Sequence, residues 1–240
     1  MPTSIEPQWR AAATFTPRSA SKTGLLEETR AFLLAYAQFH DLVQVREALH
    51  HGGLIQRSRE TRRTILTIIQ LRLTYWNPPA WVLNDLVAFA QADDAQFASV
   101  LLLHTVRQDA LLGTVVNDII VPRWAARETA ISRVDVQELL DAHLPQHPEV
   151  ARWSVTTRQK IASNALAILG DFGLLTRTPQ RRITEPLVLP PVANHLVRLL
   201  IDEGIAPDAL ATHPDWQIWL WDARRAQAAV DAVLAAEATI

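Results

Sequence analysis

Apolar residues recur at helical spacing along most of this chain, and that periodicity constrains its fold more than any other feature. The clearest run follows Ser58, a good helix-capping residue, and stops before Pro78 and Pro79, which cannot continue a helix. Comparable runs fill most of the 240 residues, so we expect an all-α protein. The residues of the clearest run, spaced i, i+3, i+4, i+8 and i+11, are Ile65, Ile68, Ile69, Leu73 and Trp76.

The helical runs fall into two halves, which follow a segment rich in Pro, Ser and Thr. We expect residues 1–24 to form a flexible arm and residues 25–128 to form an N-terminal helical bundle. A second, C-terminal helical domain is expected over residues 129–240, with the linker near residues 125–131.

The second half contains a pattern that is typical of a winged helix-turn-helix. A short helix capped by Ser132 precedes a longer helix, in which Thr156 and Gln159 have capping-box spacing. Residues 174–178 then predict a short strand, and residues 182–184 predict its return after a turn. Two helices followed by one short β-hairpin therefore predict a domain of winged helix-turn-helix character.

A cluster of arginines lies where the helix containing Ile65 begins. Residues 56–63 hold four arginines and one glutamate, Glu60, in a chain whose net charge is −2. Arginines there oppose the helix dipole unless an anion arrives, and helix N–H groups together with arginine forks suit a phosphate. The alternative is a solvated helix face with Glu60 as internal partner. The candidate phosphate ligands are Arg57, Arg59, Arg62 and Arg63.

A second basic surface is predicted on the longer helix of the winged element and on its hairpin. In helix-turn-helix proteins the start of the second helix approaches base edges, and flanking cations hold phosphates. The alternative is that the same module packs against another protein. The candidate cations of this surface are Arg158, Lys160, Arg177, Arg181 and Arg182.

Two further features are interpreted as structural. Arg72 lies inside an apolar stripe, so we expect its stem to be buried and its head to pair with a carboxylate. Three tryptophans lie between Asp215 and Asp222, whose charges repel a polyanion. Core packing or a protein interface is therefore favoured over base stacking for these indoles.

The sequence contains no recognisable catalytic or metal-binding motif. It has no His-Glu-x-x-His, no Gly-rich phosphate loop and no Gly-x-Ser-x-Gly, and it has no cysteine. His50 and His51 suit the C-terminal end of a helix, where cations are favoured. We therefore expect no enzyme, no cofactor and no metal. The absence of a signal sequence and of a membrane-length apolar run predicts a cytoplasmic protein without membrane contact.

Four segments, in their order and spacing, resemble the BrxA family, which comprises accessory proteins of bacterial BREX phage-defence systems. The resemblance extends from about Leu25 to about Leu200. It implies an N-terminal region similar to the NusB-like fold and a non-enzymatic, DNA-binding role in a multiprotein defence complex. The segments that carry it are residues 54–63, 72–73, 153–158 and 169–175.

The residues and the resemblance together predict a protein that binds double-stranded DNA through arginine contacts to phosphates. Other BREX proteins are the expected protein partners. Two alternatives stay open: an adaptor that docks acidic faces of other defence components, and RNA binding, which the NusB-like resemblance implies.

Overall fold

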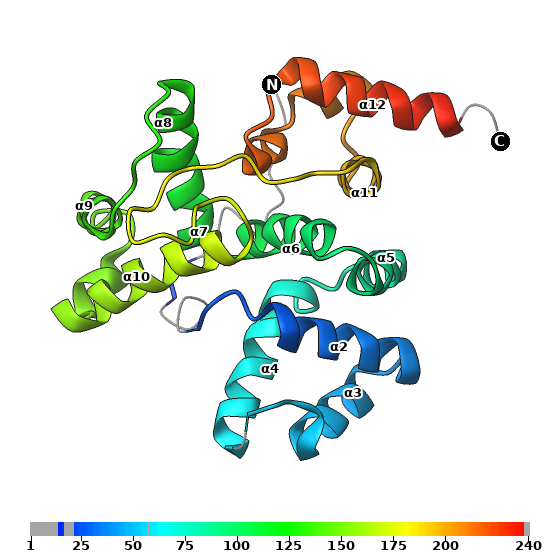
Figure 1. Cartoon of the computed structure of the whole chain (residues 1–240), viewed down its shortest axis with the longest axis horizontal. Coiled ribbons are helices and arrows are strands. Elements are labelled where there is room, and N and C mark those ends of the chain that lie inside the picture. Colours follow the sequence, from blue (N-terminus) through cyan, green and yellow to red (C-terminus); the bar gives the residue numbers. More distant parts are fainter. Residues whose placement is uncertain (1–13, 17–21, 57, 238–240) are drawn as a thin grey trace.

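The structure is a computed structural model that describes residues 14–16, 22–56 and 58–237 (Figure 1). It confirms the all-α prediction, because 71% of the chain is helical and no sheet forms among the described residues. Short 3-10 or π turns, labelled η, connect several of the α-helices. In chain order the elements are α2 Leu26–Phe39, α3 Leu42–Ala48, η2 Leu49–Gly53, α4 Arg59–Leu73, α5 Ala80–Gln91, α6 Asp94–Gln108, α7 Ala110–Val115, η3 Val116–Ile120, α8 Val121–Ala125, α9 Arg133–Ala142, η4 Pro148–Arg152, α10 Val155–Asp171, α11 Pro190–Asp202, η5 Pro207–Thr212, η6 Pro214–Trp219 and α12 Ala223–Glu237.

Helix α4 follows the predicted periodicity closely. Ser58 caps it, and its Oγ accepts the N–H of Thr61 at 3.4 Å. Ile65, Ile68, Ile69 and Leu73 are buried, which confirms these positions of the predicted core face. The last predicted position, Trp76, lies beyond the end of α4 and is half-buried. Burying such a stripe against neighbouring helices is what stabilises an amphipathic helix in a globular protein.

Arg72 is buried on the same face, as predicted. Its guanidinium donates to the carbonyl oxygens of Gly24 at 2.8 Å and of Thr23 at 3.4 Å. Burial lowers the pKa of Arg72 to about 10, while the carboxylates of Asp109 and Asp171 act in the opposite direction. This arginine therefore joins α4 to the segment before α2 and belongs to the core.

Helix α6 lies at the centre of the molecule. It packs against α4, α5, α7 and η6, and its residues 99–107 are all buried. Figure 1 shows α2 and α4 on one side of it and α11 on the other. A helix enclosed on all sides organises both halves of the chain around a shared core.

The predicted hairpin is reduced to isolated antiparallel bridges. Residues 174–176 pair with residues 182–184, where the N–H of Thr176 donates to the carbonyl oxygen of Arg182 at 2.9 Å. Residues 129–131 pair with the same returning segment on its other side. No β-strand forms here, and the winged helix-turn-helix character stays a prediction. The bridges join Leu175 with Ile183 and Ala130 with Arg182.

The caps of α9 and α10 are given by serines. Ser132 forms a capping box with Asp135 at the start of α9, which confirms it as the cap. The capping-box prediction for Thr156 and Gln159 is wrong, because α10 already begins at Val155. Ser154 has the extended backbone of a cap, and its Oγ accepts the N–H of Thr157 at 3.1 Å.

The three C-terminal tryptophans belong to the core, as predicted. Trp216 stacks on Trp221 with ring centroids 5.5 Å apart, and the indole N–H of Trp219 donates to the carbonyl oxygen of Ser99 at 3.0 Å. Both α11 and η6 pack against α6, so contacts cross the predicted boundary at residue 128. The division into two domains stays a prediction.

Part of the predicted N-terminal arm is anchored. Phe15 is 2% exposed, and its ring stacks on His147 at a centroid distance of 3.6 Å. The N–H of Phe15 donates to Glu149 at 2.8 Å, and the N–H of Gly24 donates to Asp171 at 2.8 Å. Phe15 and Gly24 thus contact the second half of the chain.

Candidate nucleic-acid interface

The predicted cations lie in two separate places. The first group lies at the start of α4, beside α3 and η2. The second lies on α10 and on residues 177–182, which follow it. Figure 1 shows the start of α4 at the lower edge of the molecule and α10 at the left, so the two groups form two surfaces.

At the start of α4, the arginines differ in what they contact. Arg59 and Arg63 are exposed to solvent. Arg62 is half-buried, and it donates from Nε to the carbonyl oxygen of His50 at 2.8 Å and from Nη1 to that of Gln56 at 2.6 Å. Arg62 therefore fastens the preceding loop to α4. Arg57, the fourth predicted residue, lies outside the described residues.

The structure adds residues to this cluster that were not among the predicted phosphate ligands. A groove of about 410 Å³ lies between α3, η2 and α4. Arg63 shares it with residues brought in by the packing of η2 against α4. A clue in the sequence was the spacing of Arg46 and His50, which are neighbours on a helix surface. The groove is lined by Val43, Arg46, Glu47, His50, His51 and Arg63.

The electrostatics of this groove are set by positive charge. Partial burial lowers the pKa of His50, and the charges of Arg59, His51, Arg62 and Arg46 lower it further. A proton on His50 would add another positive charge to this set, and the neighbouring cations disfavour it. The groove therefore carries positive charge that its own carboxylate, Glu47, does not fully balance.

On α10, the two predicted cations have different environments. Lys160 is exposed. Arg158 is half-buried and forms an ion pair with Asp141 of α9 at 2.8 Å. Arg158 therefore joins α9 to α10, whereas Lys160 is available to a partner.

The loop after α10 shows the same division. Arg181 is half-buried and donates from Nη1 to the carbonyl oxygen of Leu166, so it holds the loop against α10. Arg177 and Arg182 are exposed, with long contacts of 3.3 Å to the carbonyl oxygen of Asp171 and of 3.5 Å to the Thr129 hydroxyl. These two cations can exchange weak internal contacts for a phosphate.

A larger groove, of about 750 Å³, lies beside this loop. It runs between residues 179–181, the start of α9 and Ser163 of α10. Arg133, exposed in the first turn of α9, lines it together with Arg123, which pairs with Asp135. The groove extends the basic surface of α10 towards the N-terminus of α9.

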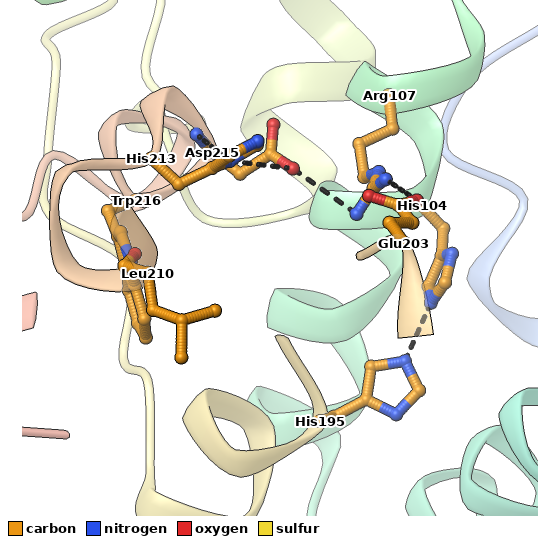
Figure 2. A network of polar contacts seen from close by, with 8 residues as sticks. All are labelled: His104, Arg107, His195, Glu203, Leu210, His213, Asp215 and Trp216. Atoms are coloured by element: carbon orange, nitrogen blue, oxygen red, sulfur yellow. Dashed lines mark hydrogen bonds and ion pairs between the residues drawn. The ribbon is translucent and has the colours of Figure 1, made fainter. Parts of the chain in front are cut away.

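Buried polar residues form a third constellation, between α5, α6 and α11 and around η6 (Figure 2). His195 bonds Asp85 through Nδ1 at 3.0 Å and His104 through Nε2 at 2.9 Å. An Asp-His-His chain could serve proton transfer, but His104 and His195 are each only 1% exposed. A substrate cannot reach rings buried in this way. We therefore interpret these hydrogen bonds as structural contacts that join α6 to α11.

The other part of this constellation is ionic. Figure 2 shows Arg107 between Glu203 and Asp215, with His213 beside Asp215. The side chains of Arg107 and Asp215 are 2% and 1% exposed. Buried charges of this kind are stable only when paired, so the network fixes η6 and α11 against α6.

The described part of the chain holds no group of three or more His, Cys, Asp or Glu side chains placed to bind a metal. In the same residues, no helix combines the length and the apolar character that crossing a bilayer requires.

Comparisons with known proteins agree with the fold. The chain is similar to a solved structure, an uncharacterized protein from Magnetospirillum magneticum, with a TM-score of 0.64 and 17% sequence identity. The similarity covers 80% of this chain and 97% of that one, and it concerns the fold alone. Proteins with curated descriptions gave no match. A model of the BrxA family matches residues 14–199, which is most of the chain. The chain therefore belongs to the BrxA family, and this membership associates it with the BREX defence systems.

Proposed function

We propose that this protein binds double-stranded DNA, without enzymatic activity of its own, as a cytoplasmic component of a BREX defence system. The observation that carries the proposal is the exposure of Lys160, Arg177 and Arg182 on α10 and on the loop that follows it. Arg158 and Arg181 support this surface from beneath, since their heads are bonded to Asp141 and to a backbone carbonyl.

The order of the elements supports the same reading. An extended segment over residues 129–131 is followed by α9 and α10, and then by two paired segments around the loop at 177–181. This is the order of a winged helix-turn-helix, in which the second helix enters the major groove and flanking cations hold phosphates. Helix α10 would be the recognition helix, and residues 177–181 would be the wing.

The number of exposed cations sets the expected dependence on salt. Each phosphate contact contributes about −0.9 to the slope of log affinity against log salt. Three contacts on this surface give a slope of about −2.7, so affinity falls roughly 40-fold between about 50 mM and about 200 mM salt. Contacts of this kind hold the backbone and carry no base preference by themselves.

Fluorescence anisotropy with a labelled duplex tests the proposal. We expect Lys160→Glu with Arg177→Glu and Arg182→Glu to lower affinity at least tenfold and to flatten the salt slope by about 2.7. Arg224→Glu, at an exposed arginine of α12, is the matched control and should change neither quantity strongly. Wild-type affinity that ignores salt, or a triple variant that binds like the wild type, would contradict the proposal.

A protein adaptor is the second candidate, and one observation favours it. Val134 and Val155, in the first turns of α9 and α10, are 54% and 65% exposed. Exposed apolar side chains beside a charged surface are typical of protein interfaces. An adaptor would ignore duplex DNA yet co-purify with another BREX protein, and Val134→Ser with Val155→Ser would break that association. Competition with structured RNA in the anisotropy assay tests the remaining alternative.

A further inference from the structure

The groove between α3, η2 and α4 gathers basic side chains from three elements. Arg46 comes from α3, His50 and His51 come from η2, and Arg63 comes from the first turns of α4. Arg59, also on α4, lies close enough to His50 to lower its pKa. Positive groups that line a concave space from several directions can surround an anion, which a flat patch cannot do.

Opposing charge in the groove is small. Glu47 is the carboxylate that lines it, and it is exposed. Glu60 is exposed in the first turn of α4. Glu28 of α2 accepts a hydrogen bond from the Gln56 side chain and is not among the residues that line the groove. Like charges gathered at close range destabilise the fold unless a ligand offsets them, so the arrangement favours an anionic ligand.

The groove is also preformed. Arg62 donates to the carbonyl oxygens of His50 and Gln56, so both ends of the loop are fastened to α4. Gly52 lies within this loop at φ 145°, a backbone conformation that residues with a side chain rarely adopt. Arg62 thus acts as a positioning residue, and the groove needs little reordering when a ligand enters.

We propose that this groove holds a backbone phosphate of duplex DNA and that binding is accompanied by proton uptake on His50. The groove is then a second anchor, separate from the surface of α10, and it adds Arg46 and His50 to the arginines of α4. The inference rests on the proposed DNA binding, because it names the place and the pH dependence of one part of it.

Proton uptake follows from the surroundings of His50. The titratable and charged groups around it are Arg46, Glu47 and His51 on its own side of the groove, and Arg59, Arg62 and Arg63 on α4. In the free protein, partial burial and then neighbouring cations lower the pKa of His50, which favours the neutral ring. A phosphate reverses the local balance and stabilises the imidazolium, so affinity rises as the pH falls towards about 6.

Anisotropy of the full chain with a labelled duplex, at about pH 7.5 and about pH 6.0, tests this. We expect wild-type affinity to rise about threefold on acidification, and His50→Gln to remove much of that rise. Arg46→Gln with Arg63→Gln should lower affinity about tenfold and flatten the salt slope by about 1.8, since two phosphate contacts are lost. Arg224→Gln is the matched control.

A second measurement separates the failure of this inference from the failure of DNA binding. Inorganic pyrophosphate, added to the full chain, should shift the His50 ring resonances in NMR spectra and raise the pKa of His50. If the wild type binds DNA and the groove variants keep its affinity, salt slope and pH response, the inference is overturned and the proposed function stays intact. Pyrophosphate binding in a chain that ignores DNA would overturn the assignment to a DNA phosphate. No shift with pyrophosphate would overturn the groove as an anion site.

Discussion

The ion pair between Arg107 and Asp215 gives the sharpest test of what holds the C-terminal region to α6. Their side chains are 2% and 1% exposed, and Arg107 Nη1 lies 3.2 Å from Asp215 Oδ2. At that distance, with an effective dielectric constant of about 20, the attraction is about 5 kcal/mol. Replacing Arg107 by methionine fills similar space but leaves Asp215 as a buried charge without this partner. We expect the free energy of unfolding to fall by about 3–5 kcal/mol.

Urea denaturation followed by tryptophan fluorescence measures this loss. Trp216 and Trp219 lie on η6 next to Asp215, so their emission reports on the region that the pair holds. Adding Asp215→Asn to Arg107→Met removes the uncompensated charge and should recover part of the lost stability. A double-mutant cycle then isolates the interaction of the two side chains.

The surface pair Arg225–Glu185 is the matched control, because its side chains are 45% and 36% exposed. Arg225→Met should cost no more than about 1 kcal/mol, since water already solvates both charges. Equal losses of less than 1 kcal/mol in Arg107→Met and Arg225→Met would refute the reasoning that burial makes the Arg107 pair important.

Two further predictions concern stability. Burial lowers the pKa of His104 and of His195 below their usual value of 6.5, so the unfolded chain binds more protons below that pH. The free energy of unfolding is therefore highest above about pH 6.5, and it falls on acidification by up to about 1.4 kcal/mol per pH unit for each histidine. Urea midpoints at several pH values measure this fall, and a flat profile from about pH 7.5 to about pH 5.5 would contradict it. Phe15→Ala should lower the free energy of unfolding by about 3–5 kcal/mol, because the ring is 2% exposed and stacks on His147. Val43→Ala is the control, since that side chain is 66% exposed. Similar small losses in both variants would refute the docking of Phe15.

Local features of the fold followed from the sequence because they depend on neighbouring residues. The apolar spacing from Ile65 and the caps at Ser58 and Ser132 predicted α4 and the start of α9 correctly. The cap of α10 did not follow, because Ser154 and Thr156 both suit a cap and the choice depends on where the backbone leaves its extended conformation. Burial of Arg72 followed from its place within the stripe.

The candidate site was less accessible to such reasoning, because a side chain's availability depends on tertiary contacts. Arg62 and Arg63 are adjacent in sequence, yet Arg62 is bonded to two carbonyl oxygens of the preceding loop and Arg63 is exposed. Arg181 likewise differs from its exposed neighbour Arg182 through the carbonyl oxygen of Leu166. No local pattern encodes which of two adjacent arginines meets a carbonyl.

The anchoring of Phe15 also has a consequence for the order in which the protein is made. Its partners His147 and Glu149 lie more than 130 residues later in the chain, and the N–H of Phe15 is bonded to Glu149 across a separation of 134 residues. Synthesis at about 5–20 residues per second leaves Phe15 outside the ribosome for on the order of 10 s before Glu149 is made. During that interval an exposed phenylalanine near the start of the chain is open to chaperones, and closing this loop is a late step of folding.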